Sequence, residues 1–146
     1  MNINSEIIFR IPYYLMNLVF ISALLSLTLI KYCNSEGASL GSIPLPASST
    51  FTKSKDNNVL YIATIDYKIY RLNYTRYVNN IVPVFLYKTS HTNEIRTMAV
   101  SQGEVYLATG SEDGSIEVSR PYTQTVLCKF TTLNQLRSIV FHPKYD

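Results

Sequence analysis

Few residues of this 146-residue chain have side chains suited to acid–base or metal chemistry, and they are scattered. His91 and Asp113 could act in general acid–base catalysis only with a third partner and a pocket around them. The two histidines and two cysteines show no metal-ligand spacing. No glycine-rich phosphate loop or nucleophile motif can be read either. The sequence therefore predicts no enzyme, with no cofactor, no metal and no small-molecule substrate.

Short runs rich in β-branched and apolar residues surround this His and Asp. Asp113-Gly114 lies between two of these runs, and Asp-Gly flanked by strand-forming residues is a strong signal for a hairpin turn. A proline at position 121 ends pairing before the last run. The four runs predict a meander of four antiparallel strands at residues 95–100, 105–111, 115–119 and 125–130.

Two short segments of the chain recur further along. The segment LYIAT at Leu60–Thr64 returns as VYLAT at Val105–Thr109, an offset of 45 (109 minus 64). The segment IRTMAV at Ile95–Val100 returns as LRSIVF at Leu136–Phe141, an offset of 41 (136 minus 95). Self-similarity at this period indicates stacked units that bury their faces only against one another.

The segments TSHTNEIRTMAV, VYLATGSEDGSIEVS and TVLCKF together resemble one repeat of the WD-repeat family. The resemblance implies a mainly β fold with about two antiparallel four-stranded propeller-type blades. Because propellers close with about four to eight blades, the chain can hold only an incomplete propeller. It either is a truncated piece of a longer protein or completes its sheets with another chain.

The resemblance also implies a structural network within the blade. In WD-repeat blades a His before the first strand, a Ser or Thr in the second, an Asp in the turn and a Trp in the third form a buried hydrogen-bonded set. His91, Thr109 and Asp113 match three of these positions. Ser119 stands in place of the Trp and Arg120 in place of the Asp that follows it, so we expect a looser blade.

The N-terminal region has a different character, because residues 11–30 carry no charge. A helix of this length spans about 30 Å, the thickness of a bilayer core. We predict an apolar helix at 1–32, a linker rich in Ser, Gly, Pro and Ala at 33–57, and the partial propeller at 58–146. A transmembrane span, a cleaved signal peptide and a misassigned first exon all remain as interpretations of the helix.

The expected function is that of a non-catalytic protein-interaction scaffold, with other proteins bound through blade edges and loops. The net charge of +3 is too mild to indicate direct nucleic-acid binding. Residues 82–143 are similar, in the order and spacing of their segments, to a WD-repeat scaffold that acts in messenger RNA 3′-end processing. The alternative is a membrane-anchored or secreted accessory protein with a small β ectodomain. The location is a membrane if residues 11–30 are kept as a span, and otherwise the nucleus or cytoplasm.

Overall fold

The computed structural model describes residues 29–33, 39–55, 58–73 and 82–143. The chain divides into two compact units, Met1–Ala47 and Ser48–Asp146, and each is considered by itself. In the first unit, β1 (Leu29–Cys33) pairs antiparallel with β2 (Ser39–Pro44). The second unit contains the eight other strands of the described residues.

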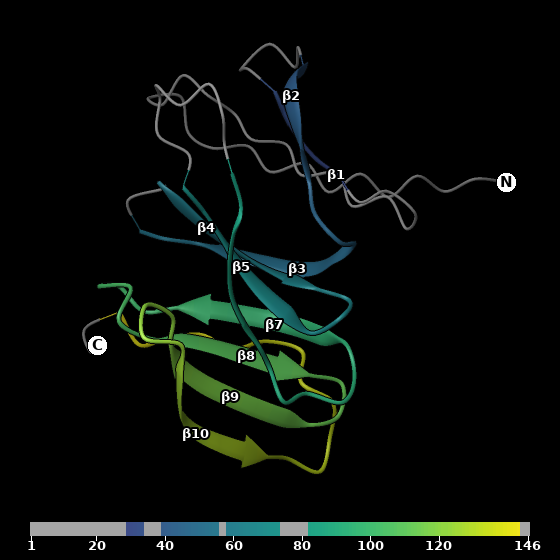
Figure 1. The fold of residues 1–146 in the computed structure, drawn as a ribbon. Coiled ribbons are helices and arrows are strands. Elements are labelled where there is room, and N and C mark those ends of the chain that lie inside the picture. The colour runs from purple at the N-terminus through teal and green to yellow at the C-terminus, as the bar shows by residue number, and fades with distance from the viewer. Residues whose placement is uncertain (1–28, 34–38, 56–57, 74–81, 144–146) are drawn as a thin grey trace, which may run out of the picture. The chain divides into compact units, whose positions relative to one another are not determined.

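The second unit consists of two four-stranded antiparallel sheets, in which each strand pairs with the next along the chain (Figure 1). Blade 1 contains β3 (Ser48–Lys53), β4 (Val59–Thr64), β5 (Lys68–Asn73) and β6 (Val84–Lys88). Blade 2 contains β7 (Ile95–Val100), β8 (Leu107–Ser111), β9 (Ser115–Arg120) and β10 (Thr125–Thr131). The prediction of two antiparallel four-stranded sheets is therefore confirmed.

The second strand of each blade is buried along its whole length. All six residues of β4 and all five of β8 are buried. β4 contains the segment LYIAT, and β8 contains the last three residues of VYLAT, so the side chains of these strands are covered on both faces of the sheet. The strands β3 and β4 contact β7, so the two blades pack against each other. The core that results contains Val59, Tyr61, Ala63, Ile69, Leu86, Tyr87, Ile95, Met98 and Leu107.

The turn between the second and third strands has the same local form in both blades. In blade 2 the Gly114 N–H donates to the Ser111 carbonyl over 3.1 Å, and Gly114 has a φ of 79°. In blade 1 the Tyr67 N–H donates to the Thr64 carbonyl over 2.9 Å, and Tyr67 has a φ of 65°. A non-glycine residue is strained in this left-handed region, so glycine suits the blade 2 turn better than Tyr67 suits its counterpart.

The segment after β10 returns across blade 2. The Ile139 N–H donates to Thr97 Oγ1 over 3.1 Å. A Cβ atom at Gly110 would lie 2.8 Å from Ile139 Cδ1 and 3.2 Å from Leu136 Cδ1, so glycine at this point of β8 admits both side chains. The recurrence of the segment IRTMAV as LRSIVF predicts a strand at residues 136–141, but this segment is not a strand, and its Ile139 N–H bonds to a side chain of β7 instead of the backbone of a neighbouring strand.

The described N-terminal residues differ from the predicted helix and linker. Of the helix predicted at 1–32, residues 1–28 lie outside the described residues, and residues 29–32 belong to β1. No helix in the described part of the chain is long and apolar enough to cross a membrane. The range predicted as a linker, 33–57, contains β2 and β3. The Ser- and Thr-rich sequence of β3 shows no apolar alternation, and backbone pairing with β4 makes it a strand.

Gly114→Ala is expected to lower the free energy of unfolding by about 1–3 kcal/mol. The added Cβ would meet the Thr132 carbonyl oxygen at 2.6 Å, and alanine is strained at a φ of 79°. Gly103→Ala is the matched control, because Gly103 is an exposed turn glycine whose φ is not positive. Chemical denaturation of both variants measures the difference, and equal stabilities would contradict the requirement for glycine at 114.

Candidate functional site

A polar cluster at one end of blade 2 surrounds the buried side chain of His91. We call it the His91 network, and its members are His91, Thr92, Thr109, Asp113 and Ser115. His91 lies on the connection between β6 and β7, and its side chain has no exposed surface. Its Nδ1 lies 2.6 Å from Ser115 Oγ, and its Nε2 lies 2.8 Å from Thr109 Oγ1. The imidazole therefore joins this connection to both β8 and β9.

The hydrogen bonds of Ser115 determine which ring nitrogen of His91 carries the proton. The Ser115 hydroxyl has one hydrogen, and it donates this hydrogen to Asp113 Oδ1. The bond between Ser115 and Nδ1 therefore needs its hydrogen from the imidazole. Nδ1–H is the donor, which leaves Nε2 as the acceptor for the Thr109 hydroxyl in the neutral ring. A directed chain of hydrogen bonds thus runs from Thr109 through the imidazole to the carboxylate.

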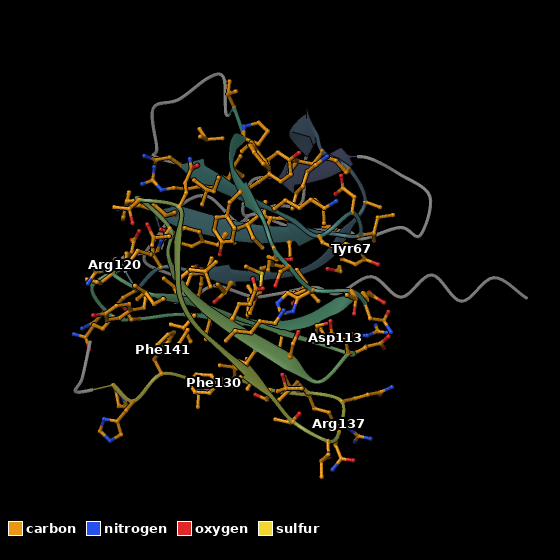
Figure 2. The ribbon with its side chains drawn as sticks, turned by 60° about the horizontal axis from the view of Figure 1, so that its bottom comes forward. Tyr67, Asp113, Arg120, Phe130, Arg137 and Phe141 are labelled. Atoms are coloured by element: carbon orange, nitrogen blue, oxygen red, sulfur yellow. The ribbon has the colours of Figure 1, made fainter. Side chains whose placement is uncertain are left out.

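The Asp113 carboxylate holds together the two loops at this end of blade 2 (Figure 2). Its Oδ2 accepts hydrogen bonds from the Thr92 N–H at 2.7 Å and from the Thr92 hydroxyl at 3.0 Å. Its Oδ1 accepts from the Ser115 N–H at 2.8 Å and from the Ser115 hydroxyl. Burial alone would raise the pKa of Asp113, but the hydrogen bonds from Ser115 and Thr92 outweigh it and hold the pKa well below its ordinary value.

Burial lowers the pKa of His91 below its ordinary value of 6.5. The Glu117 and Asp113 carboxylates oppose this shift, and the Lys129 ammonium adds to it. His91 Nδ1 lies 3.9 Å from Asp113 Oδ1, so the carboxylate is close enough to attract a protonated ring. Removal of the ring from water is nevertheless the larger effect, and the neutral imidazole is favoured in the folded chain.

A second carboxylate, that of Glu117 on β9, is fully buried beside the His91 network. Its Oε1 accepts hydrogen bonds from the Ser90 N–H at 3.0 Å and from the Ser90 hydroxyl. Lys129 Nζ lies 3.7 Å from the same oxygen and 2.5 Å from Ser90 Oγ. Glu117 Oε2 is buried without a hydrogen-bond partner among the described residues. Glu117 thus ties the β6–β7 connection to β9 and, through Lys129, to β10.

A tyrosine from blade 1 reaches the position at which the family pattern has a tryptophan. The Tyr87 hydroxyl lies 2.6 Å from Ser119 Oγ, and both side chains are buried. Burial raises the pKa of Tyr87 to about 12. The sequence predicted a looser blade because Ser119 replaces the tryptophan. The structure brings the hydroxyl of Tyr87, from β6, to Ser119, and a contact from a different blade could not be predicted from the spacing within one repeat.

A separate polar cluster links the blades at the opposite ends of the strands. Glu104 Oε2 accepts hydrogen bonds from the Tyr61 hydroxyl at 3.0 Å and from the Tyr122 hydroxyl at 3.1 Å. Arg71 lies over the Tyr122 ring, with its Cζ atom 5.2 Å from the ring centroid. Burial, and then the Glu104 charge, raise the pKa of Tyr61 far above its ordinary value. Hydrogen-bonded side chains therefore join blade 1 to blade 2 at this end of the strands.

The structure brings together all three residues that the sequence predicted for the network, His91, Thr109 and Asp113. The sequence reasoning missed Ser115 and Thr92, which supply the hydrogen bonds to the carboxylate. A signal for Ser115 was present, because an Asp commonly accepts from the backbone N–H two residues later. No such local signal exists for Glu117, since its partner Ser90 lies 27 residues away in sequence.

The hydrogen bonds of the His91 network hold the β6–β7 connection against the strands and the turn of blade 2. Its hydrogen bonds run between its own members, and its imidazole is closed off from solvent. A general base must reach a proton on a substrate, which a fully enclosed ring does not do in this arrangement. Within the described residues, no group of three or more His, Cys, Asp or Glu side chains could hold a metal ion.

These observations define the class of fold. Two meandering four-stranded sheets contact each other through the first strand of each, and a His in the connection between them is bonded to the strands of the second sheet. This is the arrangement of neighbouring blades in a β-propeller, in which each blade completes the core of the next.

The solved structures to which this chain is similar are WD40 β-propellers. The crystal structure of the Myceliophteria thermophila Cps50 (Swd1) β-propeller domain superposes with a TM-score of 0.70 at 11% identity, over 88% of this chain and 44% of that chain. The RRP9 WD40 repeats and U3-55K each give a TM-score of 0.54 at 17% identity, over 66% of this chain and 30% of theirs. At such identities the likeness shows the fold alone.

This chain spans less than half the length of these propellers. No family model matches the chain, and no curated protein matches it. The comparisons also show no resemblance to the fifty-kilodalton subunit of the cleavage stimulation factor, the 3′-end processing scaffold to which residues 82–143 were expected to be similar.

The buried His91 predicts that stability falls as the pH falls below 6.5. The unfolded chain binds a proton at His91 near that pH, whereas the folded chain binds it only at a lower pH, so acid favours unfolding. In His91→Gln we expect this loss of stability between neutral pH and the lowered pKa to disappear. His142→Gln, at an exposed position, is the control that keeps it. Urea denaturation across the pH series measures the slope, and identical slopes would contradict the assignment to His91.

Tyr87→Phe is expected to lower the free energy of unfolding by about 0.5–1.5 kcal/mol, the usual net contribution of one hydrogen bond. The variant keeps the ring but removes the hydrogen bond between Tyr87 and Ser119 Oγ, and leaves the Ser119 hydroxyl its 3.3 Å bond to the Leu107 carbonyl. Tyr67→Phe serves as the control, because its exposed hydroxyl makes only a 3.5 Å bond to the Thr92 carbonyl. Thermal unfolding compares the two variants. A larger loss in Tyr67→Phe would show that the bond to Ser119 does not hold the blades together.

Proposed function

We propose that this chain is a non-catalytic protein-interaction scaffold built from propeller-type blades. One observation carries the proposal: His91 and Glu117 are buried and hydrogen-bonded between the β6–β7 connection and blade 2, whereas large apolar side chains are exposed on the outer strands and in the loops. The exposed large apolar residues are Ile65, Val82, Val84, Phe85, Val105, Tyr122, Val126, Leu127, Phe130, Leu133 and Val140.

The distribution of these residues supports a role in protein contacts. Val84 and Phe85 belong to β6 and Val126, Leu127 and Phe130 to β10, so the outer strands of both blades expose apolar side chains. Apolar residues that gather on a surface mark interaction sites more often than scattered ones do. The outer strand of a sheet also presents unpaired backbone groups, to which another chain can pair. Another protein could therefore bind to the outer strands of the two sheets, as the scaffold proposal requires.

The finer proposal places the scaffold in messenger RNA 3′-end processing. Its support is the sequence likeness over residues 82–143, in which three segments follow in the same order and at comparable spacing. The partner in that case is a processing complex in the nucleus. The second candidate is a membrane-anchored or secreted accessory protein, and its support is the uncharged run at residues 11–30, most of which lies outside the described residues.

Cross-linking in cells tests the scaffold and separates these candidates. The full chain is expressed in cells as a fusion with a proximity-labelling enzyme, which labels the proteins near it. An amine-reactive cross-linker then identifies the proteins that contact the chain directly. We expect reproducible cross-links from partner proteins to exposed lysines of the blades, Lys53, Lys88 and Lys129. Nuclear processing factors among the labelled proteins would support the finer proposal, and proteins of the secretory pathway would support the second candidate. Cross-links confined to residues 1–47, or none above the enzyme alone, would contradict the scaffold.

A further inference from the structure

The face of blade 2 that points away from blade 1 is apolar. Successive side chains of a strand point to opposite faces of a sheet, so the strand register assigns each residue to one face. Met98 and Leu107 lie on the face toward blade 1, because they belong to the core between the blades. We call the opposite face the far face, and all but the first of its central residues are apolar. These residues are Thr97, Ala99, Ala108, Gly110, Ile116, Val118, Cys128 and Phe130.

The segment 136–141 covers the half of the far face that β7 and β8 form. Its Ile139 N–H donates to Thr97 Oγ1, and the side chains of Leu136 and Ile139 lie beside Gly110. Figure 1 shows this part of the chain, in yellow, returning toward β7 and β8. The far-face residues of these two strands are buried.

The other half of the far face, on β9 and β10, is more open. Ile116, Val118 and Cys128 are half-buried, and Phe130 is 55% exposed. The register places Phe130 opposite Ile116 and Cys128 opposite Val118, so these four residues form one continuous patch. Exposed apolar residues that lie together mark a binding surface.

The segment 136–141 lies on blade 2 as β7 lies on blade 1. β7 contacts β3 and β4, the first and second strands of blade 1. The segment contacts β7 and β8, the first and second strands of blade 2, at Thr97 and Gly110. Its sequence LRSIVF is also the recurrence of IRTMAV in β7. Position and sequence together make the segment the counterpart of β7, and hence the first strand position of a further sheet.

The segment differs from β7 in its pairing. β7 pairs with β8, whereas no strand of the described residues pairs with 136–141. The hairpin of β8 and β9 completes the contact with blade 1, since Leu107 packs in the shared core and Ser119 meets Tyr87 of β6. A hairpin paired with the segment 136–141 would stand in the same relation to blade 2, and it would cover the patch on β9 and β10.

The patch on β9 and β10 also determines the chemistry of this hairpin. Removal of apolar surface from water stabilises a contact when both surfaces are apolar. The side chains of the hairpin that meet Ile116 and Phe130 must therefore be apolar. Blade 1 contains a hairpin of this kind, because β4 and β5 place Leu60, Ile62 and Leu72 on one face.

We propose that the far face of blade 2 binds a β-hairpin of a partner protein. One strand of the hairpin pairs with the segment 136–141, and both strands pack apolar side chains on the patch that contains Ile116, Val118 and Phe130. The hairpin and the segment then form a third sheet on blade 2. This inference rests on the proposed scaffold function and names the shape and the chemistry of the partner.

Fluorescence anisotropy with the purified full chain tests the proposal. The probe is a labelled peptide with the sequence of residues 59–73, which form the β4–β5 hairpin in this chain. We expect it to bind about tenfold or more tightly than the same peptide with L60S/I62S/L72S, which lacks the apolar face. The unaltered sequence with alternate backbone nitrogens methylated should not bind, because it cannot pair as a strand.

Hydrogen exchange locates the site on the chain. We expect the amides of 136–141 to gain protection when the unaltered peptide is present and not when the methylated peptide replaces it. Protection confined to blade 1 would show instead that the peptide exchanges with the chain's own β4–β5 hairpin, and it would contradict the proposal.

Matched variants of the chain test the patch. Phe130→Asp is expected to weaken the peptide about tenfold or more, because it places a charge within the apolar contact. Val126→Asp is the control, since Val126 is exposed on the same strand but pairs with Ser119 and so lies on the opposite face. Circular dichroism of both variants verifies that the sheets remain folded.

Further outcomes would overturn the proposal: no binding of the unaltered peptide, or equal effects of Phe130→Asp and Val126→Asp. A dimer in analytical ultracentrifugation that Phe130→Asp abolishes would assign the far face to a second copy of this chain instead.

The cross-linking experiment keeps this inference separate from the scaffold itself. If partners still cross-link to the blades in Phe130→Asp, the scaffold stands and the far-face site fails. If the unaltered chain has no partners, the scaffold fails whether or not the peptide binds.

Discussion

The fold of blade 2 depends on the hydrogen-bond partners of one buried imidazole, that of His91. His91 is fully enclosed, and a buried ring with an unpaired nitrogen would be costly, so both nitrogens must find partners in the strands and turn around it. Thr109 and Ser115 supply these partners from β8 and β9. The connection from blade 1 is therefore held to the two middle strands of blade 2, beside the apolar core in which the two sheets pack.

The electrostatics around His91 explain why this arrangement is stable in its neutral form. Two carboxylates, Glu117 and Asp113, favour a proton on the ring, and burial with the help of Lys129 disfavours it more strongly. The Asp113 carboxylate already accepts hydrogen bonds from Thr92 and Ser115. A carboxylate that accepts hydrogen bonds from two loops holds these loops together. It is a weak base, because the hydrogen bonds stabilise its charged form.

Local patterns in the sequence predicted most of the second unit. The Asp-Gly turn and the repeated apolar segments predicted the strands of blade 2, because side-chain burial in β4 and β8 follows directly from composition. The first strand of blade 1, β3, was not predicted. Its sequence is polar and its backbone pairs with β4, and backbone pairing leaves no pattern in the side chains. The segment 136–141 was predicted as a strand from its likeness to β7. The local sequence does not show whether a strand beside it will supply the backbone partner.

The same division applies to the candidate site. His91, Thr109 and Asp113 were recognisable because their order within a repeat carries the information, whereas Tyr87 and Glu117 act across 32 and 27 residues of sequence. Such long-range pairs have a physical consequence for how the blades depend on one another. Tyr87 belongs to blade 1 by pairing and to blade 2 by its hydrogen bond to Ser119, so neither sheet can move without breaking a buried contact of the other. Ser119 is therefore coupled to blade 1, and the two sheets are expected to unfold together as one cooperative unit.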